Sequence, residues 1–132
     1  MNVVLDTNVI LAAFAARGLC EAVVTVCLDR HGIITSEYIL EEVTEKLEQK
    51  LKLSATRVRE IVKFLRNHST IVTPAEVPAD SCPDLDDLPI LGTLVAANAD
   101  CLVTGDAQLL DLKQYGGRPI YSPRQFYEQL QS

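Results

Sequence analysis

Acidic side chains stand at four separate places in this chain from which they could meet around a metal ion. They are Asp6, Glu42, the group Asp84, Asp86 and Asp87, and finally Asp106. Carboxylate oxygens in this number specify Mg²⁺ or Mn²⁺ rather than zinc, and they need a counter-ion if they are to ionise together. Two such ions about 4 Å apart would activate water and stabilise both oxygens of an in-line phosphodiester displacement. The acidic residues therefore indicate hydrolysis of a nucleic acid.

Asp6 and Asp106 both stand at the end of an apolar run that is typical of a buried parallel strand, Asp6 directly after Val3–Leu5 and Asp106 in Val103-Thr104-Gly105-Asp106. An aspartate at this place is also a common N-cap of the helix that follows. Either residue alone is explained as well by capping as by chemistry. Several carboxylates converging on one edge of a sheet would favour chemistry.

Glu42 lies in a helix that we predict over Glu37–Leu51, and helical phase separates it from the other glutamates. At about 100° per residue, the apolar stripe consists of Ile39, Leu40, Val43 and Leu47. Glu42 borders this stripe, whereas Glu41, Glu45 and Glu48 lie roughly opposite it. Only Glu42 can face inward, although a glutamate beside an apolar stripe can also simply reach back to water.

Asp84, Asp86 and Asp87 immediately precede a helix that Pro89 introduces. Acids in a first turn are favoured by the helix dipole, so at least one of the three is expected to have that role alone. Ile90 lies one helical turn from Asp87 and should turn this side chain toward the sheet. We select Asp87 as the candidate ligand, and Asp84 and Asp86 remain alternatives.

Short apolar runs alternate with helix-length segments along the whole chain. The expected strands are Val3–Leu5, Gly32–Thr35, Thr70–Thr73, Cys101–Thr104 and Pro119–Tyr121. The expected helices are Val9–Ala16, Glu21–Arg30, Glu37–Leu51, Ala55–Asn67, Pro89–Asn98 and Pro123–Leu130. This alternation predicts an α/β three-layer sandwich, Rossmann-like, with a central parallel sheet flanked by helices. Such sheets bind ligands beyond the carboxyl ends of their strands, where the strand order reverses.

Length and composition fit one domain over residues 1–132, because the chain is 48% hydrophobic and 23% charged. No stretch is apolar for the roughly 20 residues of a membrane span, and no signal peptide is recognisable, so we expect a cytoplasmic protein with no membrane contact. The glycine-rich motifs of dinucleotide and NTP sites are missing. The cysteines lack the spacing of a zinc site and are expected to act as small buried hydrophobes.

Four ordered motifs resemble the PIN-domain family, and within it the toxin components of toxin–antitoxin systems, similar to VapC. The motifs are Leu5-Asp6-Thr7-Asn8-Val9, Ser36 with Glu42 six residues on, Asp84-x-Asp86-Asp87-x-x-Ile90, and Leu102-Val103-Thr104-Gly105-Asp106. The resemblance runs from Asn2 to about Phe126. Leu88 and Ile90 depart from the polar and aromatic residues often found there, which keeps the choice among the three aspartates open.

The resemblance implies a PIN-like fold and a metal-dependent endoribonuclease, the toxin of a toxin–antitoxin pair, with Mg²⁺ or Mn²⁺ as cofactor. It implies Asp6, Glu42, Asp87 and Asp106 as catalytic metal ligands. Supporting positions would be Thr7, Asn8, Ser36, Asp84, Asp86 and Thr104. The implied partners are an RNA substrate and an antitoxin protein, and a homodimer is one further possibility. The alternative is a catalytically weak or inactive PIN-like module that acts mainly by binding protein.

Charge is unevenly distributed, although the formal net charge of -6 would by itself repel RNA. Seven of the twelve Lys and Arg residues fall between Lys46 and Arg66, and none falls between Asn67 and Leu112. Bound divalent ions would offset the negative charge of the acidic residues. The candidate RNA-binding residues of the basic segment are Lys50, Lys52, Arg57 and Arg59. A solvated helix face is the commoner meaning of such a segment.

Overall fold

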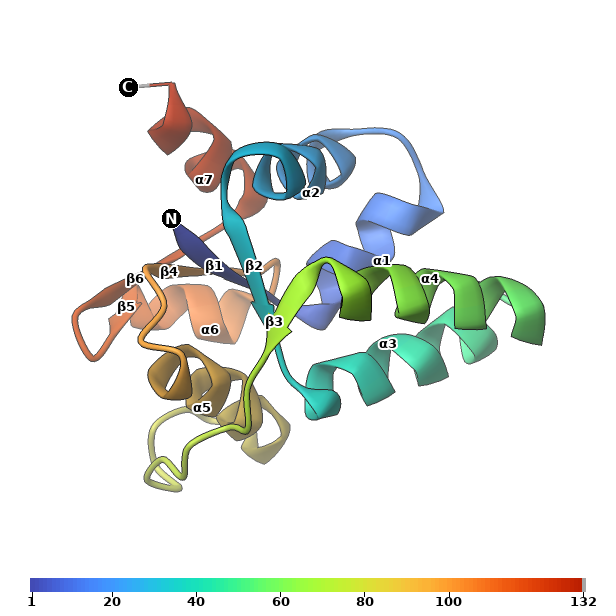
Figure 1. Cartoon of the computed structure of the whole chain (residues 1–132). Helices are drawn as coiled ribbons and strands as arrows, with labels where there is room; N and C mark the ends of the chain where they lie inside the picture. The colour runs from blue at the N-terminus through green and yellow to red at the C-terminus, as the bar shows by residue number, and fades with distance from the viewer. Residues whose placement is uncertain (132) are drawn as a thin grey trace.

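The structure, a computed structural model, describes residues 1–131, so the expected domain of residues 1–132 extends one residue beyond it. Its centre is a six-stranded sheet in the order β3-β2-β1-β4-β6-β5 (Figure 1). Neighbouring strands are parallel from β3 through β6, whereas β5 runs antiparallel to β6. The strands are β1 (Asn2–Leu5), β2 (Gly32–Thr35), β3 (Ser69–Ile71), β4 (Cys101–Val103), β5 (Gln114–Tyr115) and β6 (Arg118–Tyr121).

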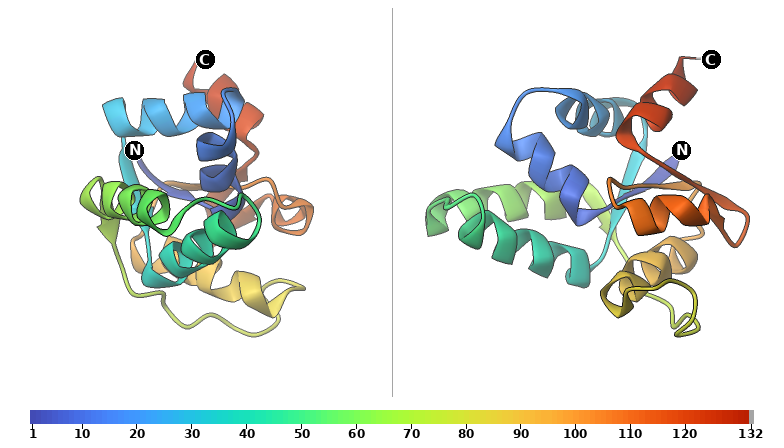
Figure 2. Two further views of the ribbon diagram at one scale, coloured as in Figure 1. Left: turned by 90° about the vertical axis from the view of Figure 1, so that its right-hand side faces the viewer. Right: turned by 180° about the vertical axis from the view of Figure 1, so that it is seen from behind.

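Helices cover both faces of this sheet, as the alternation of elements predicts. They are α1 (Thr7–Ala15), α2 (Leu19–Arg30), α3 (Glu37–Gln49), α4 (Ala55–Asn67), the 3-10 turn η1 (Leu85–Asp87), α5 (Leu88–Ala96), α6 (Ala107–Leu112) and α7 (Pro123–Leu130). Figure 1 shows α2 and α7 on one side of the sheet and α5 and α6 on the other. Helices α3 and α4 form an antiparallel hairpin that projects from the sheet (Figure 2). The predicted α/β fold is confirmed.

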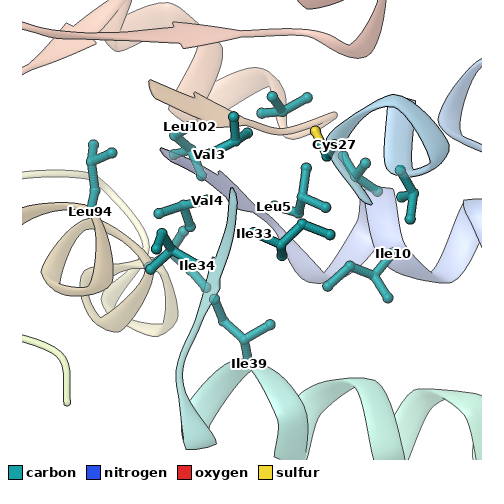
Figure 3. Packing of buried hydrophobic residues seen from close by; sticks show 14 of the residues in the cluster. Val3, Val4, Leu5, Ile10, Cys27, Ile33, Ile34, Ile39, Leu94 and Leu102 are labelled. Atoms are coloured by element: carbon teal, nitrogen blue, oxygen red, sulfur yellow. The ribbon is translucent and has the colours of Figure 1, made fainter. Parts of the chain in front are cut away.

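The core forms because the central strands are apolar on both faces. In Figure 3, Val4 and Ile34 lie toward Leu94 of α5, whereas Leu5 and Ile33 lie toward α1 and α2. Parallel strands covered on both sides need such continuous apolar runs, which is why β1, β2 and β4 were recognisable in the sequence. The apolar stripe predicted for α3 is confirmed, because the buried residues of that helix are Ile39, Leu40, Val43 and Leu47.

Differences from the predicted elements are small and occur where the sequence signal is short. Predicted boundaries differ from the observed ones by at most two residues. The predicted strand Thr70–Thr73 is found as Ser69–Ile71, on the partly exposed edge strand β3. The sequence prediction missed β5 and α6, which are two and six residues long. Neither element is a continuous apolar run like β1, β2 and β4, and neither is long enough to show a helical period.

Within residues 1–131, no single helix has the length and apolar character needed to cross a membrane. Helices α1 and α2 reach that length only when taken together, and the chain bends by 106° between them. The cysteines are free, and Cys27, Cys82 and Cys101 are buried, in line with the hydrophobic role expected for them.

The chain after β3 is held against α5 by a close backbone approach at Gly92. The backbone N of Ala75 donates to the Gly92 carbonyl at 2.9 Å. A Cβ atom on residue 92 would overlap the Ala75 carbonyl oxygen and lie 3.1 Å from the Pro74 Cβ. Glycine is unfavourable inside a helix. This contact therefore explains why glycine stands here.

We expect Gly92→Ala to lower the free energy of unfolding by about 1–3 kcal/mol, because the added methyl group must displace the Ala75 backbone. Helix propensity alone predicts the opposite sign. Urea unfolding followed by circular dichroism measures the difference. The control is Gly105→Ala, whose Cβ would approach no atom closer than 3.4 Å. A Gly92→Ala protein as stable as the wild type would show that the segment after β3 moves freely.

Candidate active site

The carboxyl ends of β1 and β4 lie side by side at the point where the strand order reverses. Leu5 and Val103 form the last pair between these strands. The backbone N of Asp6 then donates to the Val103 carbonyl at 3.0 Å. Asp106 is the third residue after Val103, the last residue of β4. The reversal of strand order therefore brings Asp6 and Asp106 to one crevice, where open α/β sheets bind ligands.

Asp6 is only 5% exposed and is surrounded by hydrogen-bond donors. Its Oδ1 accepts from the Thr7 backbone N at 2.7 Å. Its Oδ2 accepts from Thr104 Oγ1 at 2.7 Å and from Asn8 Nδ2 at 3.3 Å. Burial raises the pKa of Asp6, the bonds from Thr104 and Thr7 oppose this, and the charge of Asp106 raises it further. Asp6 thus caps α1 and also belongs to the acidic group.

Thr104 and Asn8 connect the two strand ends. Thr104 Oγ1 donates to Asp6 and accepts from the Asp106 backbone N at 3.0 Å. Asn8 Oδ1 accepts from the Gly105 backbone N at 2.9 Å. Asp106 in turn caps the first turn of α6. These bonds fix the backbone on which both aspartates stand.

Glu42 joins the group from α3 through Thr7. Thr7 Oγ1 donates to Glu42 Oε1 at 2.9 Å, while its backbone N binds Asp6. Glu42 is partly buried and Glu41 is exposed, as helical phase predicts. Burial raises the pKa of Glu42, the Thr7 bond lowers it, the charge of Asp6 raises it and Lys46 lowers it.

The three neighbouring aspartates differ in what their carboxylates do. Asp84 Oδ1 accepts from the Asp86 backbone N at 2.9 Å and so caps η1. Asp86 is exposed. Asp87 is partly buried and makes no capping bond, and its Oδ2 is a buried acceptor without a hydrogen-bond partner among the described residues. Asp87 is therefore the member of this trio whose carboxylate is left for another partner.

The pKa of Asp87 is strongly raised. Its pKa is raised to about 7, first by burial, then by the neighbouring Asp106 carboxyl, and then by the charges of Asp6 and Asp84. A carboxyl that is half-neutral near pH 7 beside other carboxyls is typical of a functional site.

Sequence reasoning missed Tyr38, whose hydroxyl donates to the Asp86 carbonyl at 2.8 Å. Burial, followed by the charges of Glu42, Asp86, Asp87 and Asp84, raises the pKa of Tyr38 to about 12. A signal was available, because residues 38 and 42 are four apart and share one face of α3.

Ser36 and Cys82 form hydrogen bonds close to the acidic group. Ser36 caps α3, and its Oγ is hydrogen-bonded to Thr93 Oγ1 of α5 at 3.1 Å, not to a carboxylate. Cys82 Sγ donates to the Asp84 carbonyl at 3.3 Å. Burial, together with Asp87, Asp84 and Asp106, raises the pKa of this thiol. Neither Thr93 nor the position of Cys82 was recognised from the sequence, because both contacts are long-range or loop-borne.

The candidate RNA-binding residues lie at the far end of the α3–α4 hairpin. Lys50, Lys52, Arg57 and Arg59 are all exposed. Lys50 follows Glu42 by eight residues, which is about 12 Å along a helix. Arg57 lies 3.6 Å from Glu60, and Arg59 donates to Thr56 at 3.4 Å. The structure therefore keeps these cations apart from the acidic group.

The atoms with which the acidic group could bind a metal suit a hard cation. They are all oxygens, which fits Mg²⁺ or Mn²⁺, and the partnerless Asp87 Oδ2 is an acceptor that a cation would satisfy. Across residues 1–131, no three His, Cys, Asp or Glu side chains are already spaced as ligands of one ion. The residues are thus an oxygen-rich set rather than a finished coordination sphere.

Solved structures resemble this fold at low sequence identity. One is the crystal structure of VapBC2 from Rickettsia felis bound to a DNA fragment from their promoter, with a TM-score of 0.65 and 14% identity over 92% of this chain and 98% of that chain. Another is the crystal structure of FitAcB from Neisseria gonorrhoeae, with a TM-score of 0.59 and 14% identity over the same shares. At this identity they support the fold alone.

No curated protein matches the sequence of this chain. A family model described as PIN domain matches residues 2–108. This range contains strands β1 to β4 and all four acidic positions, Asp6, Glu42, Asp87 and Asp106. The chain belongs to the PIN-domain family.

Proposed function

We propose that this protein is a metal-dependent endoribonuclease that hydrolyses RNA phosphodiester bonds. The observation that carries the proposal is the convergence of acidic residues from α3, η1 and the ends of β1 and β4, with the pKa values of Asp6, Glu42 and Asp87 raised by burial and by neighbouring carboxylates. Membership of the PIN-domain family supports it, because PIN domains are typically nucleases.

In this proposal Asp6, Glu42, Asp87 and Asp106 hold Mg²⁺ or Mn²⁺. The bound ions would supply water activation and stabilisation of the phosphodiester oxygens. Thr7, Asn8 and Thr104 keep the Asp6 and Glu42 carboxylates in place through the hydrogen bonds described above. Ser36 anchors the start of α3, and Asp84 and Asp86 support η1 so that Asp87 stays partly buried.

The partners in this proposal are an RNA strand and an antitoxin protein. Lys50, Lys52, Arg57 and Arg59 would contact the RNA backbone away from the cut bond. The antitoxin follows from the resemblance to toxin components, and the matched chains come from structures named VapBC2 and FitAcB. A homodimer is part of the same proposal.

We expect the purified protein to cut RNA internally in Mg²⁺ or Mn²⁺ and to leave 5′-phosphate ends, because water is the attacking group. End analysis of labelled structured RNAs, with EDTA as the metal-free arm, measures this. Full activity in EDTA, or 2′,3′-cyclic phosphate ends, would contradict the mechanism. No cleavage by the folded protein with either metal would favour the alternative of a module that acts mainly by binding protein.

The matched variants Glu42→Gln and Glu41→Gln sharpen this test. The two residues are adjacent on α3, yet only Glu42 is bonded to Thr7. Neutralising Glu42 should lower the cleavage rate by about two orders of magnitude or more, whereas Glu41→Gln should be nearly silent. Equal rates at saturating Mg²⁺, with folding checked by circular dichroism, would mean that α3 supplies no ligand.

The raised pKa of Asp87 predicts a pH-dependent stability. The pKa lies near 7 in the folded protein against 3.8 for an ordinary aspartate, so the folded state holds this proton more tightly. The contribution of the protonated Asp87 carboxyl to the free energy of unfolding is fully present below about pH 4 and is lost as the pH rises through about 7. In EDTA, Asp87→Asn should therefore have a higher Tm than the wild type at pH 8.

This Tm difference should shrink toward pH 4, because there the carboxyl is protonated in the folded wild type and is no longer fully ionised in the unfolded chain. Asp111→Asn, at an exposed position on α6, serves as the control with no expected trend. A constant difference between the Asp87→Asn and wild-type proteins across this pH range would mean that Asp87 titrates normally.

The basic residues are tested by binding without cleavage, in a Glu42→Gln background. Each phosphate contact contributes about 0.7 to the slope of log affinity against log salt for a single strand. Arg57→Ala with Arg59→Ala should weaken binding to every RNA sequence and reduce that slope by about 1.4. Arg124→Ala, at an exposed position on α7, is the control. An unchanged slope would leave Arg57 and Arg59 as a solvated helix face.

A further inference from the structure

A cleft of about 460 Å³ opens where α3 and α5 begin, and Leu88, the residue after Asp87, is part of its lining. Tyr38 of α3 forms one wall, residues 74–77 form the other, and Leu88 and Pro89 of α5 complete the lining. Figure 1 shows the extended chain after β3 passing the start of α3 and running along α5. The volume falls within the range of roughly 300–1,000 Å³ that is common for small-molecule pockets.

Tyr38 connects this cleft to the acidic group. Its ring lines the cleft, and its hydroxyl donates to the Asp86 carbonyl at 2.8 Å, one residue before Asp87. Tyr38 also feels the charges of Glu42 and Asp87. Tyr38 therefore stands between the acidic group and the cleft, where it could contact a ligand that reaches both.

The walls of the cleft are held in place. The Ala75 backbone N is bonded to Gly92 of α5 at 2.9 Å, at the close approach described above. Pro74 and Pro89 restrict the backbone on both sides. The hydroxyl bond fixes the direction of the Tyr38 ring. The cleft is thus formed before any ligand enters.

The chemistry of the lining fits a flat, mostly apolar group rather than a phosphate. Val77, Leu88 and the two prolines offer apolar surface, Tyr38 offers an aromatic face, and no lysine or arginine lines the cleft. Glu76 is exposed and charged, and its carboxylate can only accept hydrogen bonds, such as those from the amino groups of bases. Stacking on an aromatic ring is how proteins hold unpaired bases.

We propose that this cleft is a nucleobase subsite, in which Tyr38 stacks on the base next to the phosphate held at the acidic group. The proposal rests on the proposed nuclease function and extends it, because it makes the substrate a strand with an unpaired base at the cut. Tyr38 is then a residue that binds substrate and sets which RNA segments can enter.

Nucleoside 5′-monophosphates test this, because they resemble the 5′-phosphate product and cannot be cut further. In Mg²⁺, guanosine 5′-monophosphate should bind about tenfold more tightly than ribose 5-phosphate, which lacks the base. The affinity ratio of the two ligands is measured within each variant, so that changes at the phosphate position cancel. Methyl NMR signals of Val77 and Leu88 report where the base lies.

Two variants separate stacking from the structural role of Tyr38. Tyr38→Phe keeps the ring and loses the bond to Asp86, whereas Tyr38→Ala loses both. Stacking predicts that Tyr38→Phe keeps the tenfold ratio and that Tyr38→Ala reduces it to about one. If both variants lose the ratio, Tyr38 only anchors η1, and the proposal is wrong. Equal wild-type affinities for the two ligands would also overturn it.

Guanosine without phosphate distinguishes this proposal from the nuclease proposal. If ribose 5-phosphate fails to bind in Mg²⁺, the proposed metal and phosphate site fails. Guanosine should still shift the Val77 and Leu88 signals in the wild type and not in Tyr38→Ala if the cleft accepts a base. The absence of those shifts at millimolar guanosine would overturn the subsite itself.

Discussion

Repulsion among carboxylates crowded at one edge of the sheet is the constraint on which the rest of this structure depends. Burial and like charge both disfavour the ionised form of these groups. Donors offset this cost unequally: Asp6 accepts three hydrogen bonds, Glu42 accepts one from Thr7, and Asp87 Oδ2 accepts none. Hydrogen-bond donors therefore offset the cost of ionisation most fully at Asp6 and leave one oxygen of Asp87 without a donor.

The hydrogen bonds that hold the carboxylates are also the bonds that shape the chain around them. Asp6 caps α1 while it receives the Thr104 hydroxyl, and Asp106 caps α6 while its backbone N binds the same hydroxyl. Capping and site chemistry were competing explanations when each aspartate was considered in the sequence. In the folded chain they are compatible, because each cap uses only the Oδ1 atom of Asp6 or Asp106. The Oδ2 atom of each carboxylate takes no part in capping.

The sequence predicted what depends on periodicity and order along the chain. The fold class, the three longest helices (α2, α3 and α4) and the inward phase of α3 all follow from repeated apolar positions over many residues. Tyr38, Thr93 and Cys82 were missed because their contacts to Asp86, Ser36 and Asp84 depend on how loops and helices meet in space. The choice of Asp87 over Asp84 could be only weakly supported from sequence, since capping geometry decides which carboxylate is free.

Helix α3 links these separate features. It carries Glu42, and through Tyr38 it also holds η1, the exposed turn that ends in Asp87. Its orientation is set by the buried stripe of Ile39, Leu40, Val43 and Leu47. Tyr38, which lines the cleft, and Glu42 share one face of this helix. A rotation of α3 would thus move two of the four carboxylates and one wall of the cleft together. The apolar packing of this one helix therefore sets the geometry of the polar site.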